Sequence, residues 1–424
     1  MRIAVVGKGG REDAITHKIS QSPLVEKLFV IPGNPGTARY AKNVNIEICD
    51  FESILNFVNS EKVDIVVPGP ELPISKGIKN YLESNSKVFV FAPPLESSFL
   101  EASKIMAKEF MKRNAVPTAD FKAFSDYDEA LKYVKGLDSY PIVIKADGLA
   151  EGKGVSIAYT PAEAFSILYE YMVELKFGES SRKVLIEEFL TGVEYSVFVV
   201  TDGEDFLWIG DASDYKRAYD GDKGPNTGGM GSVSPVPFLT DEMRAITRDA
   251  VIKPTIEGLK RENIPYMGFL YFGLIWTSKG PKVLEFNVRL GDPEAQVILP
   301  RLKNDIVEII LSAKEHRLKD VKVEFDSRVA VCVVVASGGY PVHYEKGKLI
   351  HGLNKLSKDI VVYHAGTKEL DGKIYTDGGR VLNLVALHND FNFAAERIYS
   401  EIEKIHFENL FYRRDIGSLE RFKI

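Results

Sequence analysis

Hydrophobic and polar residues alternate regularly from Leu284 to Leu290. This period of two predicts a β-strand whose even-numbered positions enter a core. The odd-numbered positions, Glu285, Asn287 and Arg289, then place a carboxylate, an amide and a guanidinium on the opposite face. Same-face neighbours on a strand lie about 6–7 Å apart, which allows two oxygen donors to share a divalent cation. An antiparallel strand with one solvated face alternates in the same way, so the pattern alone leaves both interpretations open.

Short hydrophobic runs and helical patterns alternate along the first ninety residues. The β-rich runs cover residues 2–7, 28–31, 63–69 and 87–92, and the helical patterns cover 12–20, 51–59 and 74–83. This series predicts a βαβ domain with a parallel sheet over residues 1–102. Ligands of such sheets bind at the carboxyl ends of the strands, where the sequence has loops at 7–12, 32–36 and 68–71.

The first loop, GKGGRE, opens a predicted helix, and Arg11 adds a positive charge to it. Free N–H groups at a helix start favour an anion. The loop lacks the spaced third glycine of a dinucleotide fingerprint. It therefore favours a small phosphate over a dinucleotide, although a tight turn that binds nothing fits equally well.

Two predicted strands, 141–148 and 155–159, flank a loop that contains Gly152, Lys153 and Gly154. Such a loop can fold over phosphates, but it is not a Walker loop. Lys145 lies inside the first strand, where it either meets an anion or extends its ammonium group to solvent. Further along, Glu187, Glu188 and Glu194 form either an exposed acidic hairpin or a hinge for a purine and its ribose.

The segment 221–231 is rich in glycine, and we expect it to be mobile unless a ligand orders it. Lys216 and Arg217 precede it. A long helix at 240–263 and a strand at 268–276 lead to the alternating strand, after which a turn places Asp292 at its rim. Residues 326–424 form a predicted β-rich C-terminal module, so the fold class is α/β multidomain with α+β domains in the centre.

The composition is that of an ordinary globular protein, with 424 residues, 45% hydrophobic and 27% charged. The net charge of −6 does not favour nucleic acid as a partner. Cys49 and Cys332 provide neither a disulfide framework nor a zinc spacing. No hydrophobic run is long enough to span a membrane. We therefore expect a cytoplasmic protein, monomeric or weakly homo-oligomeric.

The candidate features complement one another chemically. A lysine on a strand, a glycine lid, an acidic hinge and a Glu-x-Asn strand together supply the parts of an ATP site. Phosphoryl transfer depends mainly on positioning and on neutralising charge. Mg²⁺ keeps water and phosphate oxygens in its shell, so two protein donors can suffice.

The sequence resembles the ATP-grasp superfamily and, within it, the phosphoribosylamine–glycine ligase family, along essentially the whole chain. The motifs that carry the resemblance are GKGGRE, PGNPG, PGPE, VIKADGLAEGKGV, DYKRAYDGDKGPNTGGMG, LEFNVRLGDPE, HAGT and YRRDIG. GPNTGGMG and GDPE are more specific than the general ATP-grasp signals. The resemblance implies an N-terminal substrate domain (1–102), an ATP-grasp region (103–325, with a lid at about 122–190) and a C-terminal domain (326–424).

The resemblance also implies residue roles. Glu285 and Asn287 bind Mg²⁺ or Mn²⁺. Phosphates, adenine and ribose of ATP are held by Lys104, Lys145, Gly152, Lys153, Gly154, Glu187, Glu188, Leu190 and Glu194. Arg289 faces the transferring phosphoryl group, and it is an implied catalytic residue together with Lys145 and Asp292.

The implied substrates are glycine and 5-phosphoribosylamine. The phosphoribosyl part is expected at Gly9, Gly10, Arg11, Asn34 and Glu71. The remaining implied substrate residues, with no division between the two substrates, are Asp211, Lys216, Arg217, Asn226, Thr227 and Asp292. The implied reaction passes through glycyl phosphate and yields glycinamide ribonucleotide, ADP and phosphate in purine biosynthesis.

Some positions depart from the family pattern. Asp13 stands where a histidine is common, and a carboxylate there would repel a phosphate, so we do not assign it to the site. Leu290 and Ala295 replace phenylalanine and threonine and change only packing.

Two other classes of protein remain alternatives. One is a bicarbonate-dependent ATP-grasp ligase, against which the GPNTGGMG loop argues. The other is a nucleotide sensor or NAD(P)-dependent oxidoreductase, which would need the dinucleotide fingerprint that the first loop lacks.

Overall fold

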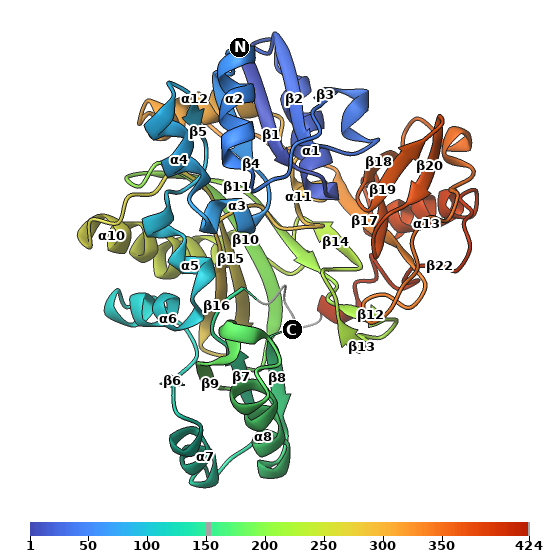
Figure 1. Ribbon diagram of the computed structural model, residues 1–424. Coiled ribbons are helices and arrows are strands. Elements are labelled where there is room, and N and C mark those ends of the chain that lie inside the picture. The colour runs from blue at the N-terminus through green and yellow to red at the C-terminus, as the bar shows by residue number, and fades with distance from the viewer. Residues whose placement is uncertain (150–153, 423–424) are drawn as a thin grey trace.

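The computed structural model describes residues 1–149 and 154–422. Three modules are visible in Figure 1: the N-terminal domain at the top, a small sheet with its helices at the bottom, and the C-terminal module on the right. A long sheet in the centre joins them. None of the helices in the described ranges is both long and apolar enough to cross a membrane.

The N-terminal domain is the predicted βαβ unit. Its strands are β1 (Arg2–Gly7), β2 (Lys27–Pro32), β3 (Lys42–Asn43), β4 (Ile65–Pro68) and β5 (Phe89–Val90), all parallel in the order β3-β2-β1-β4-β5. Its helices are α1 (Gly10–Ser20), α2 (Phe51–Glu61), α3 (Glu71–Ser75) and α4 (Ile78–Asn85), with 3-10 turns η1 (Thr37–Arg39) and η2 (Leu95–Ser97). The predicted single helix at 74–83 is divided at Gly77, whose φ of +80° suits glycine.

The lower module has a four-stranded antiparallel sheet in the order β6-β9-β7-β8 (Figure 1). The strands are β6 (Phe121–Phe124), β7 (Ile142–Ala146), β8 (Val155–Ala158) and β9 (Val184–Glu188). They pack against α7 (Tyr127–Lys135) and α8 (Pro161–Leu168), which continues as η3 (Tyr169–Val173) before η4 (Gly178–Ser181). The connection from the N-terminal domain holds α5 (Phe99–Ala102) and α6 (Lys104–Arg113), where we expected one helix.

One nine-stranded sheet runs through the centre and into the C-terminal module. Its order is β16-β15-β10-β11-β14-β17-β21-β18, with β22 beside β17. The strands are β10 (Val193–Thr201), β11 (Phe206–Asp214), β14 (Gly231–Ser234), β15 (Gly268–Thr277), β16 (Gly280–Asn287), β17 (Val329–Ser337), β18 (Val361–His364), β21 (Arg380–His388) and β22 (Leu410–Phe411). The pairing of β14 with β17 makes the predicted central and C-terminal units share one sheet, which the sequence analysis did not foresee.

Helices cover both faces of the central sheet. One hydrophobic core contains side chains of η5 (Arg248–Ile252) and α10 (Lys253–Arg261), which continue α9 (Asp241–Thr247). The core on the other face contains α11 (Ala295–Ile298) and α12 (Ile306–Lys314). The 3-10 turn η6 (Leu318–Asp320) follows α12. The C-terminal module adds α13 (Phe391–Ile402), the hairpin β19 (Thr367–Leu370) and β20 (Lys373–Thr376), and 3-10 turns η7 (Leu353–Lys355) and η8 (Glu420–Phe422).

The alternating strand is β16, but its predicted alternation is wrong at one position. Gly273 pairs with Glu285 and Leu274 with Val283, so Leu284 is the extra residue of a β-bulge. Val283 is therefore fully buried while Leu284 is only half-buried, the reverse of the expectation. Phe286 and Val288 are buried as predicted.

The glycine-rich segment 221–231 is also more regular than expected. β12 (Arg217–Tyr219) and β13 (Lys223–Asn226) form an antiparallel hairpin, with Arg217 opposite Asn226. Below we call residues 215–229, which contain the expected substrate residues Lys216, Arg217, Asn226 and Thr227, the substrate hairpin.

Candidate active site

Glu285 and Asn287 lie on β16 at the centre of the molecule. Among the described residues, no protein group hydrogen-bonds or ion-pairs with either side chain. Burial tends to raise the pKa of Glu285, but Lys216, Lys145 and Lys104 together hold that pKa below its ordinary value. The carboxylate therefore stays ionised in a ring of cations, which is an arrangement suited to a polyanion and a divalent cation.

Lys145 lies on β7 beside a buried carboxylate. Its Nζ is 2.9 Å from Glu187 Oε2, and Lys108 Nζ on α6 is 3.2 Å from Glu187 Oε1. Lys145 also donates to the carbonyl of Leu284 at 3.2 Å, which joins the lower sheet to the bulge of β16. Both oxygens of Glu187 thus lie at ion-pair distance from lysines. Sequence reasoning missed Lys108, because its place in a helix gives no sign of this contact.

Lys104 begins α6 and reaches toward the glycine loop. Its Nζ donates to the Gly148 carbonyl at 2.8 Å, and Ser103 Oγ donates to Asp147 Oδ1 at 2.9 Å. Burial lowers the pKa of Lys104. The expected lid residues Gly152 and Lys153 lie outside the described residues, and Gly154 is a buried residue directly before β8.

The expected nucleotide hinge lies where β9 ends and β10 begins. Glu188 is exposed and pairs with Lys282 at 2.7 Å, and Leu190 is half-buried. Glu194 Oε2 lies 3.1 Å from Lys216 Nζ. The carboxylate of Glu194 holds the pKa of Lys216 well above its usual range. The hinge and the substrate hairpin are therefore linked by a pair of opposite charges.

Arg289 follows the end of β16 and contacts two carboxylates of the N-terminal region. Its Nε lies 3.3 Å from Glu71 Oε2, and its Nη2 lies 2.9 Å from Glu101 Oε1. Burial raises the pKa of Glu101 to about 7 although Arg289 opposes it. For Glu71, Arg289 and Arg11 outweigh the effect of burial and lower the pKa to about 2. Sequence reasoning missed Glu101, which ends a short helix without any motif.

The loop at the start of α1 reaches the same region. Arg11 Nη1 donates to the Leu290 carbonyl at 3.1 Å, and Gly9 N–H donates to Glu12 Oε2 at 2.6 Å. A Cβ on Gly9 would lie 3.4 Å from Asp292 Oδ2. The structure thus brings Gly9, Arg11, Glu71, Arg289 and Asp292 together.

Asp292 is held by the C-terminal module. Its Oδ2 lies 3.0 Å from Arg380 Nη2, and Gln296 Nε2 donates to its Oδ1 at 2.7 Å. Arg380 also donates to the carbonyls of Asp292 and Gly228. Arg380 was not predicted, because no local pattern connects β21 with a turn almost ninety positions earlier.

Two further buried carboxylates were missed. Glu294, in the GDPE turn, is 4% exposed, and burial raises its pKa to about 8. Burial also raises the pKa of Asp214, at the end of β11, and the charge of Asp214 contributes to the raised pKa of Glu294. Lys216 acts on both of these acids and on Glu285. A group of carboxylates with shifted pKa values around one lysine is typical of a functional site.

Asp211 does not join this group, in contrast to the expected substrate role. Its Oδ1 accepts from the Val236 N–H at 2.6 Å, and its Oδ2 accepts from Arg244 Nε on α9 at 3.0 Å. Asp211 therefore fastens α9 to the sheet. Sequence position alone could not distinguish Asp211 from Asp214.

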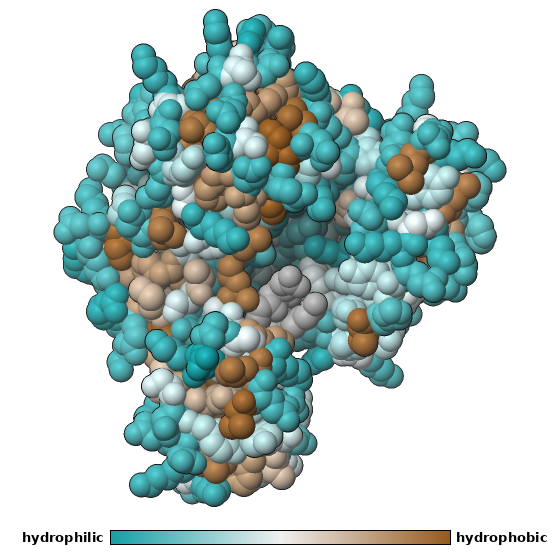
Figure 2. Space-filling model, in the orientation of Figure 1, coloured by the Kyte–Doolittle hydropathy of each residue, from teal (hydrophilic) through white to brown (hydrophobic). Residues whose placement is uncertain are grey.

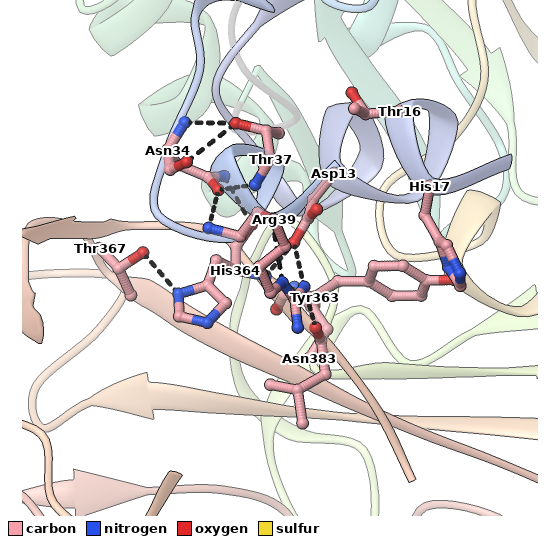
Figure 3. A network of polar contacts seen from close by, with 12 residues as sticks. Asp13, Thr16, His17, Asn34, Thr37, Arg39, Tyr363, His364, Thr367 and Asn383 are labelled. Carbon is pink, nitrogen blue, oxygen red and sulfur yellow. Dashed lines mark hydrogen bonds and ion pairs between the residues drawn. The ribbon is translucent and has the colours of Figure 1, made fainter. Parts of the chain in front are cut away.

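The N-terminal loops also contain residues that are engaged by the protein itself (Figure 3). Asn34 donates to the carbonyls of Lys8 and His364, both at 2.8 Å, and its Oδ1 accepts from the N–H groups of Gly36 and Thr37. All polar atoms of its side chain are thus occupied. A Cβ on Gly10 would lie only 2.3 Å from Asn383 Nδ2. Asn34 and Gly10 therefore build the joint between the N-terminal domain and the C-terminal module.

Asp13 belongs to the same joint. Its Oδ2 accepts from Arg39 Nη2 at 3.1 Å and from the His364 N–H at 2.8 Å (Figure 3), while its buried Oδ1 has no hydrogen-bond partner among the residues that the structure describes. Burial raises the pKa of Asp13 to about 6. Its exclusion from the substrate residues agrees with this position.

The substrate hairpin carries Lys216, Arg217, Asn226 and Thr227. Arg217 Nη1 donates to the Gly224 carbonyl at 2.9 Å, and Thr227 Oγ1 donates to the Lys216 carbonyl at 2.8 Å. Figure 2 shows a recessed hydrophilic surface between the N-terminal domain, the C-terminal module and the lower module.

Models of the phosphoribosylglycinamide synthetase family match nearly the whole chain. The N domain matches residues 1–101, the ATP-grasp (A) domain residues 102–295 and the C domain residues 330–419. A phosphoribosylamine–glycine ligase of Caldanaerobacter subterraneus is 48% identical over 99% of this chain and 100% of its own length. The Escherichia coli K12 enzyme of the same name is 43% identical, with 98% of each chain covered.

Solved structures are similar to this chain over nearly its whole length. The phosphoribosylamine–glycine ligase of Thermotoga maritima has a TM-score of 0.83 and 36% identity, and covers 98% of this chain and 100% of its own. A biotin carboxylase domain of Hydrogenobacter thermophilus shares the fold, with a TM-score of 0.73 at 18% identity over 97% of this chain and 91% of that one. By its sequence and by its three matched domains, the chain belongs to the phosphoribosylglycinamide synthetase family.

Proposed function

We propose that this protein joins glycine to 5-phosphoribosylamine with ATP, forming glycinamide ribonucleotide, ADP and phosphate in purine biosynthesis. The observation that carries the proposal is the ionised Glu285 within a ring of three lysines, beside Asn287, on the strand that continues into GDPE. The names of the relatives above indicate the substrates.

ATP is assigned to the space between the lower module and β16. Lys145 and Lys104 approach it from β7 and α6, and the hinge residues Glu188 to Leu190 border it at the end of β9. Glu187 holds Lys145 in place, because its buried carboxylate is 2.9 Å away. The role of the lysines is to neutralise phosphate charge without reorganisation during transfer.

The donor chemistry at β16 fits Mg²⁺, with Mn²⁺ as a substitute. Glu285 and Asn287 offer oxygen ligands, and no three His, Cys, Asp or Glu side chains of the described residues converge on a metal site. Phosphate oxygens and water would complete such a shell. When bound, the cation withdraws charge from the phosphate oxygens.

The acceptor substrates are assigned to the opposite side of Arg289. The space assigned to phosphoribosylamine is bordered by Gly9, Arg11 and Glu71, and Asp292 lies beside Gly9. Glycine is assigned to the space between Glu294, Asp214 and Lys216. Its ammonium group suits the two acids, whose pKa values burial raises although Lys216 opposes the rise.

The proposed ligation has two steps. A carboxylate oxygen of glycine attacks the γ-phosphorus, the bond from that phosphorus to the bridging oxygen breaks, and ADP leaves. The neutral amine of phosphoribosylamine then attacks the acyl carbon, phosphate leaves with the oxygen that came from glycine, and the amine loses a proton. We assign Arg289 to binding of the acyl phosphate. Exclusion of water protects this reactive species from hydrolysis.

The test is an assay with mass identification of the product. ADP and glycinamide ribonucleotide are expected in equal amounts, and only with glycine, phosphoribosylamine and MgATP all present. Full ADP formation with bicarbonate in place of glycine would contradict the proposal and favour a carboxylase-type ATP-grasp reaction.

A further inference from the structure

The motif YRRDIG near the C-terminus has no part in the reaction above. β22 ends at Phe411, which pairs with Ala336 of the central sheet, and the chain then crosses to the substrate hairpin. Arg413, in the middle of this motif, is 1% exposed and is one of the largest fully buried side chains of the protein. A buried guanidinium is costly unless its donors are used by partners within the protein.

Arg413 joins the C-terminal segment to the first strand and to the tip of the hairpin. Its Nη1 donates to the Arg217 carbonyl at 3.0 Å and to Asp222 Oδ1 at 2.8 Å. Its Nε and Nη2 donate to the two oxygens of Asp415 at 2.8 and 2.6 Å, a fork-to-fork pair. Asp415 Oδ2 also accepts from the Gly221 N–H at 2.9 Å. One guanidinium thus fixes the start of the hairpin, its tip and the tail.

The tip of the hairpin requires this support. Gly221 and Asp222 both have positive φ, +69° and +53°, and Asp222 is not a glycine. A left-handed conformation at a residue with a side chain persists only where its surroundings hold it. Arg413 supplies that hold through the carboxylate of Asp222.

The other parts of the hairpin reach the proposed substrates. Lys216 pairs with Glu194 beside Glu285, and the Gly228 carbonyl accepts from Arg380, which also binds Asp292. None of these groups contacts Arg413. Arg413 therefore acts on the site through the hairpin and does not border it.

We propose that Arg413 is a positioning residue, which fixes the substrate hairpin so that Lys216 and the Gly228–Gly229 edge are preorganised for the acceptor substrates. This inference rests on the proposed function. It predicts that replacing Arg413 weakens the use of glycine or phosphoribosylamine more than that of ATP, because, among the described residues, Glu188 to Leu190 of the hinge form no hydrogen bond or ion pair with the hairpin or with Arg413.

The test compares Arg413→Ala, Arg413→Lys and the control Arg414→Ala in the full chain. Arg414 has the same charge one position later, and it contacts the hairpin through its backbone N–H, which the substitution retains. For Arg413→Ala we expect the KM of glycine or phosphoribosylamine to rise at least tenfold, with binding of a non-hydrolysable ATP analogue changed less than twofold. Arg413→Lys should fall between Arg413→Ala and wild type, and Arg414→Ala should match wild type. A fall in kcat alone, with both KM values unchanged, would overturn the proposal.

Hydrogen exchange provides a readout that does not require activity. In Arg413→Ala, amides of β12 and β13 should exchange at least tenfold faster while those of β17 and β21 do not change. Unchanged exchange in the hairpin would overturn the proposed role of Arg413. This conclusion holds even if the wild-type protein proves not to ligate glycine. If Arg413→Ala does not fold, Asp222→Gly removes the carboxylate and suits the positive φ. A KM increase with faster hairpin exchange supports the proposal, and the absence of both contradicts it.

Discussion

The two sides of the proposed active site differ in how far the protein itself satisfies their polar groups. On the N-terminal side, Asn34 uses every polar atom of its side chain for the protein. On β16, among the described residues, Glu285 and Asn287 have no hydrogen-bonded or ion-paired protein partner. Buried polar groups are normally paired. All three residues belong to sequence motifs, but they differ in role. Asn34 holds two parts of the protein together, whereas the polar groups of Glu285 and Asn287 are available to a ligand.

The largest effect is expected on the unpaired side. Glu285→Gln should lower the kcat/KM for ATP-dependent ligation by about 10³-fold, because it removes a charged ligand for the cation that accompanies ATP. The melting temperature should change by only a few degrees, since no hydrogen bond or ion pair within the described part of the chain depends on the carboxylate. Steady-state kinetics and a thermal scan check both. Glu257→Gln, on the exposed face of α10, is the matched control. Undiminished activity at saturating Mg²⁺ would remove Glu285 from the metal site.

A pH-dependent effect is expected at the joint. The folded-state pKa of Asp13 is raised to about 6 from 3.8, so the folded state binds more protons between these values. Its contribution to stability is thus full below pH 4 and is lost as pH rises through 6, by about 3 kcal/mol in total. Asp13→Asn should remove this loss, so its stability relative to wild type should rise from pH 4 to 7. Denaturant unfolding at both pH values measures it, and a constant difference would contradict the pKa shift.

The smallest effect concerns Asn34. Asn34→Ala should lower the free energy of unfolding by about 2 kcal/mol, because buried N–H and carbonyl groups lose their partners. Binding of an ATP analogue should not change, since the hydrogen-bond partners of Asn34 do not belong to the proposed nucleotide site. Urea unfolding and calorimetric titration separate the two effects. If Asn34→Ala weakened ATP binding and left the stability unchanged, Asn34 would be a ligand-binding residue and not a structural one.

The sequence predicted the parallel sheet, the polar strand and the lysines, because each is a local pattern. It did not predict the bulge at Leu284, since a register shift depends on the partner strand. It also missed Glu101 and Arg380, which reach the site only through long-range pairing, and Glu294, whose raised pKa depends on burial and on Asp214 of another strand. The shared sheet arises in the same way, from β14 and β17, almost a hundred residues apart.

Asp211 shows a further limit. It lies three positions from Asp214 on one strand, yet the two carboxylates serve different surroundings, α9 and the site. Composition and spacing alone do not distinguish Asp211 from Asp214. Only the direction of each side chain from the sheet separates a fastening residue from a candidate ligand-binding residue.

The central claim is that glycine, activated as glycyl phosphate, is the group that the protein ligates. Glycine labelled with ¹⁸O in its carboxylate tests this most directly, in a reaction with MgATP and phosphoribosylamine. We predict that the released phosphate carries one ¹⁸O atom from glycine for each glycinamide ribonucleotide formed. Unlabelled phosphate released together with the product would contradict the claim.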